Sequence, residues 1–352
     1  MMIQTSVTEE AMSNNAAEPL PTSTRAWSLV SRPEGRPTTD DVALQVLALP
    51  DLQDGQILVE NEYLSVDPYM RGRMSDKKSY MPPFDVGAPM DGPAIGRVLA
   101  SRSDDFAVGD HVFHVLGWRE HAVLDADTAF PVDPDAAPLP AYLGVLGIPG
   151  LTAYVGIERF AEISGGETVY VSGAAGAVGS VAGQIAKIRG AERVIGSAGS
   201  DEKVRELVEV FGFDAAFNYK TAPIADQLAE LAPDGVDVVF DNVGGEAMEA
   251  GIGALRVHAR FVLAGMLSQY NDEAVVGPRN LWHLSITRSR ILAFMVSEEM
   301  DLRDRFLREA SGWIAEGTLR HRETIREGFD GMFDAFLAMM RGENTGKMVV
   351  RV

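Results

Sequence analysis

The chain contains no cysteine. It can therefore form neither a disulfide nor a thiolate zinc site, and it has no cysteine nucleophile. This absence does not fix the cellular compartment.

Positive charge is scarce. Lys and Arg total 31 against 51 Asp and Glu, a formal net charge of -20. Such a field repels polyanions and acidic membrane surfaces, and no block of Lys or Arg interrupts it. We therefore expect no nucleic-acid partner and no membrane partner; solubility alone is reason enough for the acidic excess.

Long apolar runs are also missing. None reaches the roughly 18 residues of a membrane span. Residues 1–25 lack an apolar core and are acidic, so neither a secretory signal nor a mitochondrial presequence fits, and we expect a cytoplasmic protein. Residues 1–24, rich in Ser, Thr, Asn, Ala and Pro, are predicted to be a flexible tail.

The rest of the chain predicts two domains, since 352 residues with 46% hydrophobic content exceed one typical domain. Residues 25–146 contain short β-rich runs at 56–60, 94–99 and 111–115, separated by Gly, Pro and Asp. This pattern indicates a compact, β-barrel-like domain.

Residues 147–316 alternate predicted strands with predicted helices, which is typical of an α/β fold with a doubly wound parallel sheet. The predicted strands are 168–172, 193–196, 215–218, 236–241, 260–265 and 291–296, with helices ending at 189 and lying near 202–211. Residues 317–352 hold an apolar-faced helix and a strand at 347–352, and we expect them to complete the first domain.

The strand predicted at 168–172 runs directly into a turn of small residues, followed by a helix. The turn comprises Gly173, Gly176, Ala177, Val178 and Gly179. Small residues let the backbone approach a pyrophosphate, and a helix N-terminus favours anions. The spacing is G-x-x-G-x-x-G rather than G-x-G-x-x-G, so a tight turn that binds nothing is the alternative.

The end of the second strand indicates the cofactor. Sites for NAD usually carry Asp or Glu there, whereas residues 196–200 read GSAGS. Ser200 can cap the next helix, and Lys203 in its first turn can meet a 2′-phosphate. NADPH is therefore favoured over NADH, although Lys203 alone could be a solvated surface lysine.

From about residue 26 onward the chain resembles the zinc-independent branch of the medium-chain dehydrogenases/reductases, which contains prostaglandin reductases, leukotriene 12-hydroxydehydrogenases and curcumin reductases. Collinear stretches carry this resemblance: YLSVDPYMRGRM (63–74), GWREH (117–121), GVLGIPGLTAYVG (144–156), 172–187, GFDAAFNYK (212–220), FDNVGG (240–245), GMLSQYN (265–271) and NTGK (344–347). It implies a homodimer whose subunits combine a GroES-like catalytic domain with a Rossmann domain.

The resemblance also implies cofactor contacts. Gly176 to Gly179 would hold the pyrophosphate, and Lys203 and Tyr219 the 2′-phosphate. The nicotinamide half would be lined by Asn242, Gly265, Met266, Leu267, Ser268, Phe294, Met295, Val296 and Asn344. Asn242 and Asn344 could equally be turn residues.

Reduction of a conjugated double bond needs a hydrogen-bond donor for the carbonyl oxygen. A zinc ion is disfavoured as that electrophile, because the six His residues show no H-E-x-x-H spacing. The resemblance points instead to Tyr270, with Tyr80 as second candidate; a loop aromatic that closes over the cofactor is the alternative for Tyr270. We interpret Tyr63 and Tyr69 as packing residues.

The resemblance also implies apolar walls for an enone or enal substrate, formed by Met70, Met81 and Trp118, with simple core packing as the alternative for each. Arg71 and Arg73 could steer an anion or form surface salt bridges. A quinone reductase on the same scaffold, a secondary-alcohol dehydrogenase and a cofactor-binding protein without turnover remain alternatives.

Overall fold

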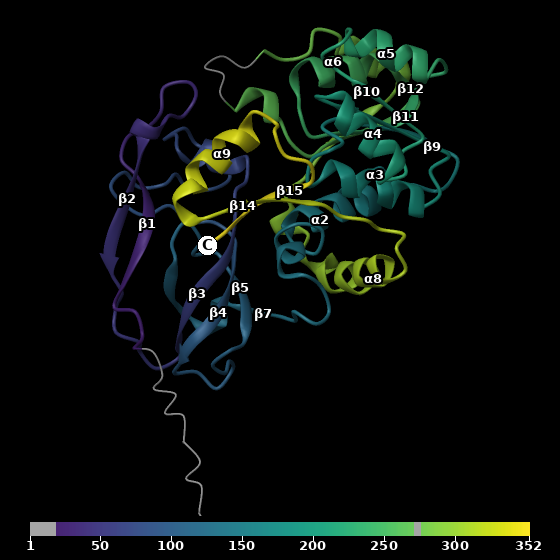
Figure 1. Ribbon diagram of the computed structural model, residues 1–352. Coiled ribbons are helices and arrows are strands. Elements are labelled where there is room, and N and C mark those ends of the chain that lie inside the picture. The colour runs from purple at the N-terminus through teal and green to yellow at the C-terminus, as the bar shows by residue number, and fades with distance from the viewer. Residues whose placement is uncertain (1–18, 271–275) are drawn as a thin grey trace, which may run out of the picture.

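The computed structural model describes residues 19–270 and 276–352. In this part the chain forms two bodies side by side, one built from the N-terminal and C-terminal strands and one from the middle of the chain (Figure 1). Most of the predicted tail falls outside the described residues, and β1 begins at Ser23. None of the helices described combines the length and apolar composition needed to span a bilayer.

The first body contains a seven-stranded sheet with the order β14-β15-β3-β4-β5-β7, and β6 also pairs with β3. A separate hairpin of β1 and β2 lies beside it. The strands are β1 (Ser23–Leu29), β2 (Val42–Ala48), β3 (Gln56–Ser65), β4 (Ala94–Ser101), β5 (His111–His114), β6 (His121–Asp125), β7 (Phe130–Val132), β14 (Glu323–Glu327) and β15 (Lys347–Arg351).

The end of the chain belongs to this body. β15 pairs antiparallel with the end of β3, where Val349 lies opposite Ser65. Helix α9 (Met332–Met340) buries its apolar face against the same core, and Figure 1 shows both elements among the N-terminal strands. A distant segment thus completes the sheet.

The core of the first body includes two residues predicted to line a substrate pocket. Trp118 is 0% exposed and packs edge-on against Phe336, and Met70 is 1% exposed. The indole Nε1 of Trp118 lies 3.4 Å from the Met70 sulfur. The prediction was wrong for this pair, because neither side chain reaches an open surface.

The second body is a six-stranded, fully parallel sheet with the order β10-β9-β8-β11-β12-β13. In order of appearance this is 3-2-1-4-5-6, the Rossmann arrangement, whose order reverses between β8 and β11. The predicted fold class is confirmed. The strands are β8 (Thr168–Val171), β9 (Arg193–Ala198), β10 (Ala215–Asn218), β11 (Val236–Asp241), β12 (Leu255–Leu263) and β13 (Arg290–Ala293).

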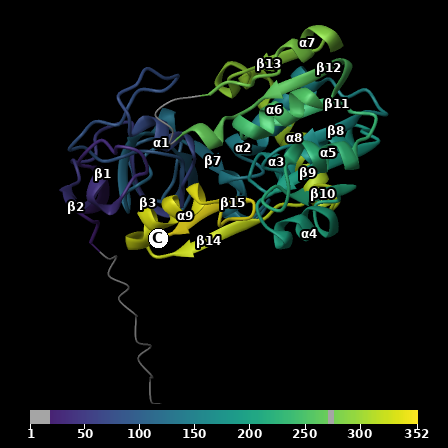
Figure 2. The same cartoon turned by 90° about the horizontal axis from the view of Figure 1, so that it is seen from above.

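Helices cover both faces of this sheet, as expected for parallel strands buried on both sides (Figure 2). One face packs against α2 (Ile148–Val155), α3 (Gly179–Ile188), α4 (Asp201–Glu209) and α8 (Arg303–Ala315), and the other against α5 (Ile224–Leu231), α6 (Gly245–Gly253) and α7 (Trp282–Thr287).

The largest differences from the predicted strand boundaries of this sheet lie in its last two strands. β12 begins at Leu255, five residues early, and β13 ends at Ala293 rather than at residue 296. Phe294 leaves the strand to stack on Phe160, with ring centroids 4.8 Å apart. Packing on the α2 side thus ends the strand before its apolar run does.

Candidate active site

The glycine turn joins β8 to α3 at the point where the strand order reverses. Gly173 has a φ of +56°, which favours glycine, and its carbonyl accepts the N–H of Gly176 at 3.0 Å. A Cβ on Gly179 would lie 2.5 Å from the Gly173 carbonyl oxygen. The turn therefore depends on glycine at both ends, and the N-terminus of the ten-residue α3 offers the positive dipole end that a pyrophosphate needs.

The neighbouring turn after β9 carries the predicted 2′-phosphate residues. Ser200 caps α4, its hydroxyl accepting the Lys203 N–H at 3.3 Å. The ammonium of Lys203 donates to the carbonyl of Gly342 at 2.7 Å, and burial, followed by the charge of Lys220, lowers its pKa. Lys203 is thus half-buried and held by a backbone carbonyl, and its role at a 2′-phosphate stays a prediction. The Tyr219 hydroxyl lies 3.0 Å from where a Gly199 Cβ would stand.

A buried carboxylate that the sequence analysis missed organises the turn after β11. Asp241 is 0% exposed and accepts the N–H groups of Val243 at 3.1 Å and Gly244 at 3.0 Å, as well as the Ser172 hydroxyl. Burial raises its pKa, while these donors oppose the rise. Its place at the carboxyl end of a central strand was the available signal.

The predicted nicotinamide-side residues lie around this turn. The Asn242 amide donates to the Ser172 carbonyl at 2.8 Å, and the Ser268 hydroxyl donates to the Val243 carbonyl at 2.7 Å. Gly265, Met266 and Leu267 connect β12 to Ser268, and the Gly265 N–H donates to the Asp241 carbonyl. Phe294, Met295 and Val296 follow β13, and the side chains of Phe294 and Val296 pack against the α2 side of the core.

The C-terminal turn brings Asn344 to the same edge. Its amide donates to the Gly346 carbonyl at 2.7 Å, and the Gly346 N–H donates to Ala175 of the glycine turn at 2.8 Å. Both Asn242 and Asn344 therefore make turn contacts, in keeping with the alternative interpretation, and both lie beside the glycine turn.

Two tyrosines from different bodies approach each other. Tyr80 lies in the loop that follows α1 (Tyr69–Arg73), and Tyr270 ends the turn after β12. Partial burial, and next the nearby Tyr270 hydroxyl, raise the pKa of Tyr80 to about 12. Burial raises the pKa of Tyr270 as well. Tyr80 as a whole residue is 59% exposed. Both phenols stay protonated at neutral pH and can donate hydrogen bonds.

Tyr69, interpreted from sequence as a packing residue, borders this pair. Burial and then the Asp67 carboxylate raise its pKa, and Tyr80 is among its neighbours. Met81 follows Tyr80 and is partly exposed, unlike the buried Met70. Tyr69, Tyr80 and Tyr270 therefore form a tyrosine cluster.

A buried ion pair supports the tyrosine cluster. Lys347 is 3% exposed; its ammonium lies 3.1 Å from Asp67 and donates to the carbonyls of Val66 and Met348 at 2.8 and 2.9 Å. Asp67 also accepts the Ser65 hydroxyl. This pair joins the turn beside the cofactor loop to the segment that carries Tyr69.

Arg71 and Arg73 are buried rather than on the surface, 6% and 7% exposed. Arg73 forms a bidentate pair with Asp91, stacks on Phe84 at 4.0 Å and donates to the Pro82 carbonyl. The surface-salt-bridge prediction was wrong, and Arg73 instead fixes the loop that carries Tyr80.

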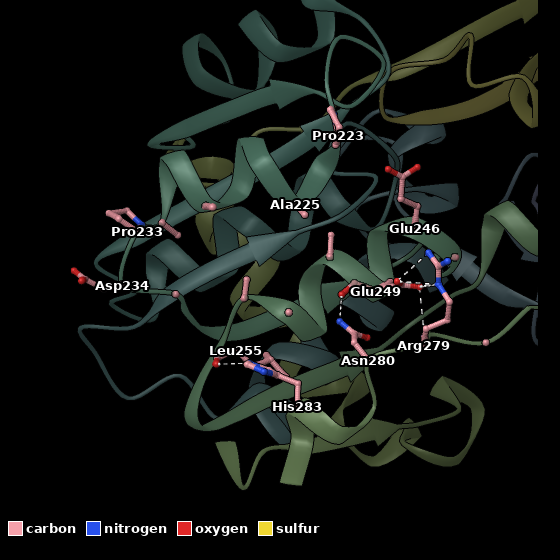
Figure 3. Close-up of a pocket in the computed structure, with 18 of the residues that line it drawn as sticks. Pro223, Ala225, Pro233, Asp234, Glu246, Glu249, Leu255, Arg279, Asn280 and His283 are labelled. Atoms are coloured by element: carbon pink, nitrogen blue, oxygen red, sulfur yellow. Dashed lines mark hydrogen bonds and ion pairs between the residues drawn. The ribbon is translucent and has the colours of Figure 1, made fainter. Parts of the chain in front are cut away.

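A groove of about 930 Å³ lies elsewhere, between α5, α6 and residues 276–283 (Figure 3). Glu249 pairs there with Arg279, and Asn280 donates to the Glu249 carbonyl. None of the predicted site residues lines it. We therefore place the candidate site at the glycine turn and the tyrosine cluster.

Comparison with known proteins matches both bodies. Residues 25–132 match the family described as "N-terminal domain of oxidoreductase", and residues 177–311 match "Zinc-binding dehydrogenase". Among residues 19–270 and 276–352, however, no group of three or more His, Asp or Glu is arranged to hold a metal ion.

Two relatives and one solved structure span nearly the whole chain. Prostaglandin reductase 1 of Mus musculus is 41% identical over 93% of this chain and 98% of its own. NADPH-dependent curcumin reductase of Escherichia coli is 38% identical, covering 93% and 96%. The crystal structure of CurA from Vibrio vulnificus in complex with NADPH superimposes with a TM-score of 0.87 at 37% identity, covering 93% and 99%.

Proposed function

The chain belongs to the medium-chain dehydrogenase/reductase family, and from this premise we propose that it reduces the carbon-carbon double bond of α,β-unsaturated ketones and aldehydes. It is an NADP-dependent oxidoreductase, and NADPH is its cofactor. The observation that carries the enone proposal is that two protonated phenols from different bodies, Tyr80 and Tyr270, influence each other, with Tyr270 ending the turn whose Ser268 donates to Val243.

The residues present fit NADPH. The glycine turn and the α3 N-terminus would hold the pyrophosphate, and the turn after β9 has no carboxylate that would repel a 2′-phosphate. Lys203 would supply a positive charge there. When bound, NADPH supplies a hydride for the β-carbon of the conjugated alkene.

The chain's own task is to stabilise the negative charge that develops on the carbonyl oxygen. Tyr270, with Tyr80 as the second donor, would direct a phenolic O–H at that oxygen. Because burial raises both pKa values, each hydroxyl keeps its proton while it donates. The Arg73–Asp91 pair and the Asp67–Lys347 pair hold the backbone that positions Tyr80 and Tyr69.

The test follows the near-ultraviolet absorbance of reduced nicotinamide with a panel of 2-alkenals, alkenones, curcumin and quinones. Removing one donor from an oxyanion typically costs about 10²–10³ in rate, so Tyr270→Phe should lower kcat for enones by about a hundredfold. Tyr142→Phe is the matched control, since the Tyr142 hydroxyl donates to Asp133 away from this site.

Each alternative has its own outcome. Turnover of quinones alone would replace the enone proposal with a quinone reductase on the same fold. Binding of NADPH without turnover of any substrate would favour the non-catalytic interpretation. An unchanged kcat in Tyr270→Phe, with enones reduced normally, would remove Tyr270 from the mechanism.

The homodimer implied by the family resemblance is also a proposal. β13 forms the edge of the six-stranded sheet (Figure 2), and α7 beside it exposes Trp282 at 75% and Ile286 at 56%. Contiguous exposed apolar side chains at a strand edge suit a second copy of the chain.

A further inference from the structure

Lysine is rare in this chain, and its placement is uneven. The six lysines are Lys77, Lys78, Lys187, Lys203, Lys220 and Lys347. Lys187 and Lys347 pair with Asp214 and Asp67. In the described residues neither Lys203 nor Lys220 has a carboxylate partner within 4.0 Å. Lys77 and Lys78 likewise form no ion pair in the described residues, so it is their common position in the fold that distinguishes Lys203 and Lys220.

Sheet register places these two lysines together. β9 and β10 are parallel, with Ala198 opposite Asn218, so the residues that follow the two strands leave the same edge side by side. The Tyr219 N–H donates to the Ala198 carbonyl at 3.1 Å, which continues this register past the last strand pair. Lys203 begins α4 just after the first turn, and Lys220 follows Tyr219 in the second.

Local contacts fix the backbone at Lys220 and place the Tyr219 ring near its ammonium. The Lys220 ammonium lies 5.8 Å from the centroid of the Tyr219 ring, whose hydroxyl reaches Gly199. The Lys220 N–H donates to the Asn218 side chain at 3.1 Å, and that side chain in turn donates to Asp201 of α4 at 2.8 Å. Burial has the larger effect on the pKa of Lys203, and the positive charge of Lys220 lowers this pKa further.

The nearest acids do not neutralise this pair. Glu202 and Glu206 lie on α4 and act on Lys203, but Glu206 is engaged by Arg322. Lys203 has one N–H committed to Gly342, Lys220 is exposed, and Asp201 beside the Gly199–Ser200 turn accepts a hydrogen bond from Asn218. Two cations at one sheet edge, neither of them in an ion pair within the described residues, can serve a dianion.

Resting on the NADPH-dependent function above, we propose that Lys220 is a second cation of the 2′-phosphate subsite and contributes directly to the preference for NADPH over NADH. Lys203 supplies a fixed hydrogen-bond donor, and Lys220 supplies the second positive charge. Tyr219 contributes its ring at the same edge of the sheet. The adenosine ribose without its 2′-phosphate gains nothing from Lys220.

Binding of cofactor fragments to the full chain tests this without any substrate. Isothermal titration calorimetry would compare 2′,5′-ADP, which carries the 2′-phosphate, with 5′-AMP, which does not. In Lys220→Ala we expect 2′,5′-ADP to bind about tenfold more weakly, because a charge-assisted hydrogen bond is lost, and 5′-AMP to change less than about twofold. Lys220→Arg should retain most of the affinity, and the wild-type advantage should shrink as salt rises.

Arg205→Ala is the matched control, because Arg205 is an exposed cation two residues from Lys203 on α4. A tenfold loss confined to 2′,5′-ADP in Lys220→Ala, with Arg205→Ala unchanged, supports the inference. Equal losses of 2′,5′-ADP affinity in the two variants would mean that only the overall charge matters, and this result would overturn the inference. If Lys203→Ala loses 2′,5′-ADP affinity while Lys220→Ala does not, the Lys220 role is wrong and the NADPH-dependent function stands. The assay involves no enone turnover, so failure of the Lys220 inference can be distinguished from failure of the enone proposal.

Discussion

Acidification should destabilise the first body through one buried histidine. His114 is 1% exposed; its Nδ1 accepts the Leu116 N–H at 3.1 Å, and its Nε2 lies 2.8 Å from the Asn61 side-chain oxygen. This pattern assigns the proton of the neutral ring to Nε2, which donates to Asn61. A second proton would have to sit on Nδ1, facing another donor. Burial first, and the charge of Arg119 second, lower the pKa of His114 to about 3.

The different pKa values of His114 in the folded and unfolded chains set the sign and size of the change in stability with pH. An unfolded histidine titrates near pH 6.5, so between about pH 6.5 and 3 the unfolded chain binds a proton that the folded chain does not. The contribution of neutral His114 to the free energy of unfolding is complete above pH 6.5 and is lost as the pH falls through this window. At about 1.4 kcal/mol per pH unit, the loss reaches about 2 kcal/mol at pH 5 and about 5 kcal/mol near pH 3.

The assay compares urea unfolding of the wild-type protein and His114→Gln at pH 7.5 and 5.0, by tryptophan fluorescence and far-UV circular dichroism. The variant should be less stable at pH 7.5, because it loses a hydrogen-bonded buried ring. Its further loss on going to pH 5.0 should be about 2 kcal/mol smaller than that of the wild type, since other titrating groups cancel in the difference. Equal pH dependence of the two proteins would refute the reasoning.

Three other perturbations have defined outcomes. Gly183→Ala should lower the free energy of unfolding by about 1–3 kcal/mol, measured by thermal denaturation, because the added methyl would run into the ring of Phe213; unaltered stability would contradict that packing. With enone substrates, kcat/KM should show no loss between pH 7 and 9, since burial raises the pKa of Tyr270 above its ordinary value of about 10; a decline with an apparent pKa near 8 would argue against a phenolic donor. Trp282→Glu should shift the molar mass in sedimentation velocity from dimer to monomer, whereas an unshifted mass would exclude α7 from the proposed interface.

The sequence predicts best where one local pattern decides the outcome. The strand before the glycine turn is apolar at three of its four positions and is buried in full, and the β11 and β10 predictions match the structure at both ends. Ser200 was predicted to cap α4 from its residue type and position, and it does so. Parallel strands buried on both faces leave this signature because most of their positions are apolar.

Local sequence patterns did not predict contacts between residues that are far apart in the chain. Asp67 and Lys347 are 280 positions apart in the chain, and nothing near either residue indicates a buried ion pair. Trp118 and Met70 were assigned to a pocket because apolar side chains suit both a pocket and a core, and only the packing of α9 over them decides between the two. The roles proposed for Tyr80 and Tyr270 came from the family resemblance, and the cytoplasmic location stays a prediction.

The position of β15 has a consequence for how the protein is made. This strand completes the sheet beside β3, and Lys347 completes the ion pair under the tyrosine cluster, yet both come from the last residues of the chain. During synthesis the middle body can form before β15 is made, whereas Tyr63–Ser65 at the end of β3 have no β15 partner until that strand has left the ribosome. The sheet of the first body therefore closes only after the middle body has been made, and until then the end of β3 is a strand edge open to mispairing.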